Sequence, residues 1–330
     1  MAVTVRTPAR LHLGLLDLNG GLGRLYGSIG VAIERPEIVL EAELIQEPVG
    51  ARGLVVEGLE VERVTALAQR FLEHYPLRSR VRLRLRSSIS AHIGLGSGTQ
   101  LALAVGAALA QLGGLALTVP DLSLVMGRGN HSGIGIATFQ QGGFVVDGGH
   151  VIGADHQSVP PVLFHYPFPK GWIFVVAVPD TEPGFHGEGE QRAFQFLPPA
   201  PSALVEKICR LLVIKMLPAL LEQDIVPFGQ ALTEIQQLVG DCFSAAQGGR
   251  YANTVSARLI GHLLDRGAQG GGQSSWGPTV YALVEGESRA VSLQNEAKEF
   301  LAANGQGHVF CVHADNLGAQ FSKDSLPSVG

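Results

Sequence analysis

The sequence predicts an α+β protein with two domains. The chain has 330 residues, of which 46% are hydrophobic and only 16% are charged, so it can bury a large core. Strand-like and helix-like segments are mixed without strict alternation, which favours α+β over a doubly wound sheet. Two proline-rich stretches, residues 159–161 and 167–169, indicate a junction. We therefore expect one domain over residues 1–160 and a second over residues 161–330.

The elements of the first domain follow from the periodicity of its apolar residues. Helical spacing places Val64 and Phe71 on one face of a helix at residues 60–75. Residues 97–112 are apolar enough to resemble a membrane span, but Gln111 and the glycines after it favour a buried core helix. The same reasoning gives a short helix at residues 121–128 and strands at residues 3–6, 38–45, 81–86 and 144–147.

The second domain has the same mixed character. Strands are expected at residues 172–178, 279–284 and 308–313, and helices at 188–196, 203–221, 226–246, 251–266 and 288–303. Residues 181–196, with His186, Glu188, Glu190 and Arg192, form either a lid over a site or an ordinary charged helix start. The glycine-rich residues 270–278 form a flexible loop or, given their side-chain donors, a binding loop.

Charge and cysteine content exclude several classes of protein. The net charge is −5 and there is no block of Lys or Arg, so no nucleic-acid partner is expected. Five arginines over positions 78–86 alternate with Ser79, Val81, Leu83 and Leu85, which places them on one solvated face of a strand. The three cysteines are scattered and no signal peptide is evident, so we expect a cytoplasmic protein without a zinc site or a membrane partner. The sequence is compatible with either a monomer or a homodimer.

The most informative segment runs from Ile93 to Gln100. Three glycines follow a strand-like run and precede an apolar helix, so the backbone can turn sharply and approach a ligand. Ser97 and Thr99 can cap the helix or donate to an oxyanion, and the free N–H groups of the first turn favour an anion. The spacing fits neither a P-loop nor a dinucleotide fingerprint. It predicts a phosphate site, with an ordinary turn and helix cap as the alternative.

Three segments, in order, resemble the GHMP superfamily of galactokinase, homoserine kinase and mevalonate kinase. They are residues 8–14, residues 94–99 and the glycine-rich residues 270–282. The resemblance implies an N-terminal domain like domain 2 of ribosomal protein S5 and a ferredoxin-like C-terminal domain. It also implies that phosphate is bound by Gly94, Leu95, Gly96, Ser97, Gly98 and Thr99.

One departure from the kinase pattern bears directly on the reaction. Kinases of the mevalonate type carry a Ser-Gly-x-Asp motif whose aspartate deprotonates the acceptor hydroxyl. The matching stretch is Ser132-Gly133-Ile134-Gly135, and glycine cannot accept a proton. The resemblance therefore disfavours an ATP-dependent kinase of that mechanism.

The strings His92 to Leu103, Gly142 to Gly149 and Gly272 to Thr279 resemble the β-ribofuranosylaminobenzene 5'-phosphate synthase family more closely. That resemblance implies a decarboxylating pentosyltransferase that joins phosphoribosyl pyrophosphate to 4-aminobenzoate and releases CO2 and pyrophosphate, in tetrahydromethanopterin biosynthesis. His131 and Tyr26 depart from the residues usual in the family, which leaves room for a paralogue with another acceptor. The alternatives are a small-molecule GHMP kinase and a non-catalytic ligand-binding relative.

The matched segments supply the candidate site residues. The resemblance implies His12, Asp17, His92 and His131 as catalytic groups and Arg10, Arg24, Arg128, Gly272, Gln273, Ser274, Ser275 and Trp276 as substrate contacts. Arginine suits bidentate contact with oxyanions, and a tryptophan can stack on an aromatic acceptor. Mg²⁺ is the expected cofactor, with Asp17 and Asp147 as its ligands, and no nicotinamide, flavin or zinc is expected. Each of these residues alone also has an ordinary structural role as its alternative.

Overall fold

The molecule consists of two mainly antiparallel β-sheets and the helices that pack on them. In the computed structural model, residues 2–45, 53–153, 158–181 and 187–322 are described. The larger sheet has the strand order β12-β1-β2-β4-β3, with β5 and β6 paired to β2 and β7 paired to β5. The smaller sheet has the order β11-β8-β10-β9. The mixed order of the elements agrees with the α+β class that the sequence predicts.

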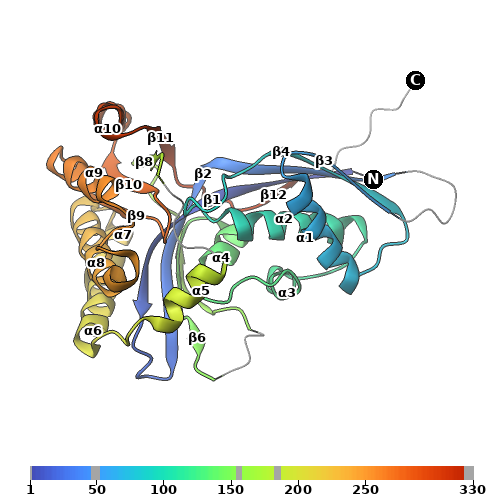
Figure 1. The fold of residues 1–330 in the computed structure, drawn as a ribbon, viewed down its shortest axis with the longest axis horizontal. Helices are drawn as coiled ribbons and strands as arrows, with labels where there is room; N and C mark the ends of the chain where they lie inside the picture. The colour runs from blue at the N-terminus through green and yellow to red at the C-terminus, as the bar shows by residue number, and fades with distance from the viewer. Residues whose placement is uncertain (1, 46–52, 154–157, 182–186, 323–330) are drawn as a thin grey trace.

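The strands β1 (Ala2–Asp17) and β2 (Arg24–Ile45) form the backbone of the larger sheet. They pair antiparallel along almost their whole length and run between the two groups of helices in Figure 1. The sequence predicted only short parts of each strand, because register shifts and inserted glycines break the alternation of their apolar residues. The remaining strands of this sheet are β3 (Gly53–Gly58), β4 (Arg80–Ser87), β5 (Phe144–Asp147), β6 (His150–Val151), β7 (Val162–Tyr166) and β12 (Gln320–Ser322).

Helices α1 (Val61–His74) and α2 (Ser97–Leu112) pack on the inner face of the larger sheet. Nearly every side chain of α2 is buried, which confirms the core helix expected from its apolar sequence. Among the described residues, no helix is long and apolar enough to cross a membrane. Helix α3 (Val119–Val125) begins with a capping box between Thr118 and Asp121. Helix α4 (Ile134–Gln141) is an element that the sequence did not predict.

The outer face of the larger sheet carries the alternating arginines of β4. Arg82 and Arg86 pair with Glu43 and Glu41 of β2, and Arg84 lies near Glu57 of β3. Val81, Leu83 and Leu85 point to the other face and are buried. The predicted solvated strand face is confirmed, and the arginines serve the sheet rather than a ligand.

The smaller sheet is buried on both faces. Its strands are β8 (Trp172–Pro179), β9 (Gly270–Gln273), β10 (Val280–Glu285) and β11 (Gly307–His313). Helices α9 (Thr254–Asp265) and α10 (Glu287–Asn304) cover one face, and α8 (Ile225–Gln247) covers the other. Burial on both faces explains the unbroken apolar run of β8. The remaining helices are α5 (Gly187–Phe196), α6 (Ser202–Leu211), the π-helical turn η1 (Leu212–Met216) and α7 (Leu217–Glu222).

The two halves share one hydrophobic core, which runs from Leu11 and Leu13 of β1 to Phe228 and Ile235 of α8. The chain also crosses between the two sheets more than once. Strand β7 follows residue 160 but pairs with β5 in the larger sheet, and β12 returns to pair with β1. The boundary at residues 160 and 161 stays a prediction, because β7 and β12 both follow it and yet belong to the larger sheet.

Candidate active site

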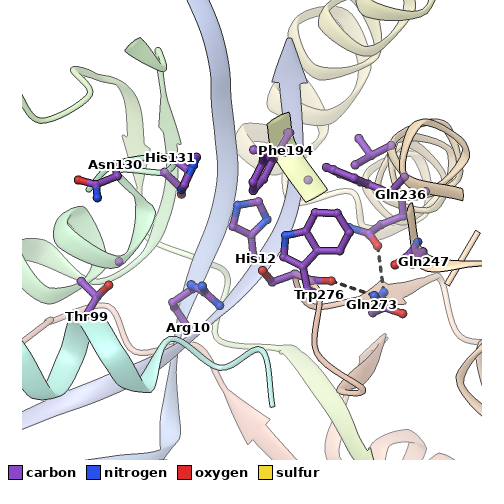
Figure 2. Close-up of a pocket in the computed structure, with 18 of the residues that line it drawn as sticks. Arg10, His12, Thr99, Asn130, His131, Phe194, Gln236, Gln247, Gln273 and Trp276 are labelled. Carbon is purple, nitrogen blue, oxygen red and sulfur yellow. Dashed lines mark hydrogen bonds between the residues drawn. The ribbon is translucent and has the colours of Figure 1, made fainter. Parts of the chain in front are cut away.

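A cavity of about 410 Å³ opens where the two halves meet. Its walls come from β1, the start of α2, the turn before α4, α5, α8 and the loop between β9 and β10. Figure 2 shows Thr99 and Asn130 on one side, Trp276 and Gln273 on the other, and Arg10 between them. A cleft between two halves of a protein, lined by convergent polar groups, is the ordinary place for a small-molecule site.

The predicted phosphate loop reaches one end of this cavity through Thr99. Helix α2 begins at Ser97, and Gly96 with a φ of 82° is its N-cap. The side chains of Ser97 and Thr99 therefore do not cap the helix, which corrects that expectation and leaves both hydroxyls for other partners. Thr99 lines the cavity, whereas Ser97 is only 6% exposed.

The two glycine-rich segments interlock beside the cavity. The Ser274 hydroxyl donates to the Gly94 carbonyl at 2.7 Å, and the Thr279 hydroxyl donates to the Ile93 carbonyl at 2.6 Å. A Cβ atom added at Gly94 would come within 2.2 Å of the Ser274 carbonyl oxygen. Glycine is needed here for close approach of the two backbones. Ser274 also accepts a bond from the backbone N–H of His12, so its hydroxyl joins three segments.

Arginine side chains give the cavity a cationic lining. Arg10 donates to the Gly94 carbonyl at 2.5 Å and lies against Gly96. Arg128 lines the cavity near Gly98, and burial together with neighbouring arginines lowers its pKa. Arg250 is held in a two-bond contact with Asp241. The described residues that line the cavity include no aspartate and no glutamate, so its field favours anionic ligands.

Aromatic rings from distant parts of the chain gather along the cavity wall between His131 and Trp276 (Figure 2). Trp276 lies edge-on to Phe243 of α8 at 4.4 Å and to Phe194 of α5 at 5.5 Å between ring centroids. Phe194 stacks on His131 at 4.6 Å. Tyr26 meets both Phe194 and His131 at 5.3 Å. We call Trp276, Phe243, Phe194 and His131, which line the cavity, the aromatic wall.

His12 lies in the middle of the cavity, and its environment keeps it neutral. The imidazole is 8% exposed, and burial followed by the nearby charge of Arg10 lowers the pKa of His12 from 6.5 to about 3. An imidazole with this pKa carries no charge near neutrality and is a weak base. It can still accept or donate a hydrogen bond to a ligand in the cavity.

The wall contributed by α8 and β9 carries amide side chains. Gln236 donates to the Leu13 carbonyl at 2.6 Å and accepts from the backbone N–H of Gln273 at 2.9 Å. Gln273 in turn accepts from the Ala252 N–H and donates to the Ser275 carbonyl. Residues 270–273 form a buried strand rather than the loop expected from their glycines. A Cβ at Gly272 would overlap Gln236, so this strand needs glycine to pack against α8.

The structure brings together one part of the predicted site. The predicted residues that line the cavity are Arg10, His12, Thr99, Arg128, His131, Gln273, Ser275 and Trp276. His92 is exposed in a left-handed conformation and does not line the cavity. Arg24 is also elsewhere, because its guanidinium donates to the carbonyls of Gly148 and Gly149. Ser274 and Gly272 are buried packing residues, and Gly94, Leu95, Gly96, Ser97 and Gly98 shape the loop from outside the lining.

The two predicted metal ligands have structural partners instead. Asp17 accepts bonds from the N–H groups of Asn19 and Gly20 in the turn after β1. Asp147 is fully buried and accepts from the Ser28 hydroxyl and from the N–H groups of Gly133 and Gly149. Neither carboxylate lines the cavity, and the described residues contain no group of three metal-ligating side chains. These residues do not fit a magnesium ion held by Asp17 and Asp147.

Gly135 lines the cavity at the position where the kinase motif has its base. A Cβ there would come within 3.0 Å of the Thr99 side chain, so even a small side chain would have to displace it. The Gln100 amide fixes this backbone by donating to the Gly135 carbonyl at 2.8 Å. The cavity is therefore built around a glycine at this point.

Sequence reasoning missed at least seven residues that line the cavity. They include Asn130, Phe194, Gln236, Phe243, Gln247, Arg250 and Tyr251. Most belong to helices whose inner face has the sequence pattern of an ordinary core face, so no local pattern identifies them as site residues. Phe194 falls within the segment expected as either a lid or a helix start, and α5 does contribute it to the cavity. His186 lies outside the described residues.

Comparison with known proteins gives the family. The model of the GHMP kinases N terminal domain matches residues 62–143, and that of the GHMP kinases C terminal matches residues 216–303. A β-ribofuranosylphenol 5'-phosphate synthase from Methanothermobacter thermautotrophicus is 35% identical over 96% of this chain and 97% of its own length. The synthase of the same name from Archaeoglobus fulgidus is 39% identical over 91% of this chain and 93% of its own length. The chain belongs to the β-ribofuranosylphenol 5'-phosphate synthase family.

The solved structures agree on the fold. A homoserine kinase from Cytophaga hutchinsonii has a TM-score of 0.69 at 19% identity, with 97% of each chain covered. At this identity the likeness shows the GHMP fold alone, and it confirms the fold expected from the three motif segments. The curated relatives of the synthase family are named for a ribofuranosylphenol product, whereas the sequence resemblance implied an aminobenzene.

Proposed function

We propose that the protein transfers the ribosyl 5-phosphate group of phosphoribosyl pyrophosphate to an aromatic carboxylate, with loss of CO2 and pyrophosphate. One observation carries this proposal. The cavity has Arg128 and the first turn of α2 at one end, Arg10 in the middle, aromatic rings toward the other end, and no carboxylate among its described lining residues. That arrangement suits a phosphorylated sugar at one end and an aromatic anion at the other.

The proposed reaction balances without a base that removes a ring proton. The bond between C1 of the ribose and the pyrophosphate oxygen breaks, and its electron pair leaves with pyrophosphate. The ring carbon that bears the carboxylate bonds to C1, and the carbon–carboxylate bond then breaks to return two electrons to the ring. CO2 leaves in the place that a proton would otherwise take. A site with Gly135 at the position of the kinase base fits this chemistry.

The residues act by binding and by stabilising charge. The N–H groups at the start of α2 and the Thr99 hydroxyl face the leaving pyrophosphate, where negative charge develops. Arg10 lies between the two ends, beside neutral His12, and supplies a positive charge to the sugar phosphate or to the acceptor carboxylate. Mg²⁺ enters the proposal as the counter-ion of the pyrophosphate group, since the described lining offers it no carboxylate.

The acceptor is a benzoate with an electron-donating substituent opposite its carboxylate. An amino group gives the aminobenzene implied by the sequence motifs, and a hydroxyl group gives the phenol for which the curated relatives are named. His131 and Tyr26, the two positions that depart from the family pattern, contact each other beside the aromatic wall. The choice between the two acceptors, and the place of the product in tetrahydromethanopterin synthesis, belong to this proposal.

A pyrophosphate-release assay tests the proposed function. The protein is incubated with phosphoribosyl pyrophosphate, Mg²⁺ and either 4-aminobenzoate or 4-hydroxybenzoate, and pyrophosphate is followed. We expect release that depends on one of the two acceptors and does not require ATP. Phosphorylation of an alcohol by ATP, with no turnover of phosphoribosyl pyrophosphate, would replace the proposal with the kinase alternative.

A further inference from the structure

Three arginines from different elements converge on the outer side of the α2 N-terminus. A Cβ atom built at Gly98 would lie 3.3 Å from Nη1 of Arg128 and 3.6 Å from Nη2 of Arg63. The Arg70 guanidinium lies against Gly127, directly before Arg128, and donates to the Val125 carbonyl at 2.6 Å. Arg63 and Arg70 belong to α1 and do not line the cavity, whereas Arg128 does.

The cluster holds more positive charge than its neighbours balance. Arg63 pairs with Glu60 at 2.7 Å, and Glu60 is also bonded by the Ser88 hydroxyl. The Arg128 side chain makes no hydrogen bond or ion pair within the described parts of the chain, and its Nε is buried without a partner. Burial and the charges of Arg63 and Arg70 lower the pKa of Arg128. An arrangement of like charges around a buried, unsatisfied donor is costly without an anion to face.

We propose that Arg63, Arg70 and Arg128 form a subsite for the distal phosphate of a pyrophosphoryl group. The identity of the anion as pyrophosphate rests on the proposed function. The phosphate nearer the sugar faces the first turn of α2 and Thr99 in the cavity, and Arg128 spans both places. A diphosphate is the anion that can reach from the cavity lining to arginines outside it. The subsite holds the leaving group as its charge develops and holds the pyrophosphate product afterwards.

Binding of inorganic pyrophosphate to the whole protein tests the subsite without catalysis. Titration calorimetry is run on the wild-type protein, Arg63→Gln and Arg70→Gln. The matched control is Arg86→Gln, because Arg86 is an arginine on the outer sheet face that pairs with Glu41. A charge-assisted hydrogen bond is worth enough that we expect each cluster variant to weaken pyrophosphate binding by about tenfold or more. The control should bind as tightly as wild type.

Thermal unfolding separates this role from a purely structural one. We expect pyrophosphate to raise the Tm of the wild-type protein and of Arg86→Gln, and to raise that of Arg63→Gln much less. Without pyrophosphate, Arg63→Gln should be as stable as wild type, because it removes repulsion as well as the pair with Glu60. A large loss of Tm in Arg63→Gln, with pyrophosphate affinity unchanged, would overturn the subsite.

The same titrations distinguish the subsite from the proposed function. The protein could bind pyrophosphate more tightly than Arg63→Gln and Arg70→Gln and yet not consume phosphoribosyl pyrophosphate. That result would support the subsite and contradict the proposed function. Acceptor-dependent turnover, together with equal pyrophosphate affinity in all four proteins, removes the subsite and leaves the function standing. An equal loss of affinity in Arg86→Gln would show a general charge effect and would also overturn it.

Discussion

At the scale of single residues, the unusual group in the cavity is His12. His12 is buried in the wall of the cavity, and this burial lowers its pKa to about 3, so the ring stays uncharged near neutrality. The sequence could mark His12 as a site residue, because it lies in a matched motif. It could not give the protonation state, which depends on Arg10 and on the closure of the cavity by distant helices.

The neutral state of His12 makes the fold sensitive to acid. A histidine whose pKa falls from 6.5 to about 3 on folding binds fewer protons in the folded state. Its stabilising effect is therefore complete above pH 6.5 and is lost as the pH falls toward 3. We expect wild type to lose up to about 1.4 kcal/mol per pH unit below 6.5 through this group, and His12→Gln to lose less.

Urea unfolding of both proteins between pH 7 and pH 5 measures this difference. Burial raises the pKa of Asp147, which has the opposite effect on stability, so the informative quantity is the gap between the two proteins. A gap that stays constant over this range would mean that folding leaves the pKa of His12 unchanged.

The Thr99 hydroxyl is the side-chain donor of the phosphate loop that reaches the cavity. We expect Thr99→Val, which keeps the shape and removes the hydroxyl, to lower kcat by about 10²- to 10³-fold, as loss of a transition-state donor does. Thr99→Ser should recover most of the rate. Steady-state kinetics with fixed acceptor gives both values, and a near-normal rate for Thr99→Val would leave Thr99 with a packing role against Gly135.

At the scale of elements, many of the site residues lie in turns or near the ends of helices and strands. The start of α2 and the turn before α4 supply the polar end. The aromatic wall comes from α5, α8 and the β9–β10 loop, together with His131 of the turn before α4. Helix α2 is predicted from sequence with its observed bounds because its apolar run is long and its glycines mark the start. Helix α4 and strand β9 are not, because α4 has only 8 residues and β9 consists of three glycines and a glutamine. Their conformation is set by tertiary packing that a local pattern does not contain.

Helix α5 offers a matched pair of phenylalanines for testing the aromatic wall. Phe194 contacts Trp276, Phe243 and His131, whereas Phe196 is 83% exposed. Aromatic pairs are worth about 0.5–1.5 kcal/mol, so we expect Phe194→Leu to weaken acceptor binding by about 2- to 12-fold. Phe196→Leu should leave it unchanged. Acceptor KM at saturating phosphoribosyl pyrophosphate gives the comparison, and equal values for the two variants would remove Phe194 from the acceptor site.

At the scale of the whole molecule, two glycine-rich segments hold the halves together next to the cavity. Gly94 has a φ of 92° and lies against the Ser274 carbonyl, whereas Gly114 has a φ of 64° with nothing within 4 Å of an added Cβ. Alanine at either site carries a backbone penalty of about 1–2 kcal/mol, because its Cβ is disfavoured in the left-handed region. Gly94→Ala adds overlap that we expect to cost a further ~1–3 kcal/mol.

Chemical denaturation of Gly94→Ala and Gly114→Ala tests this interlock. We expect the larger loss of stability for Gly94→Ala, accompanied by loss of activity because the phosphate loop shifts. Equal losses in the two variants would indicate that the loops separate easily. The family motifs predicted that both segments belong to the site, but their direct contact could be seen only in the folded chain.

The central claim is that CO2 replaces a proton as the group lost from the acceptor ring, so that a cavity without a described carboxylate suffices. The most direct measurement uses acceptor labelled in its carboxyl group and counts labelled CO2 and pyrophosphate in the same reaction. We expect the two products in a 1:1 ratio, both dependent on phosphoribosyl pyrophosphate and both formed without ATP. Pyrophosphate release with the label retained in the aromatic product would contradict the claim, because the acceptor would then have to lose a proton, from its ring or from its substituent, to a base.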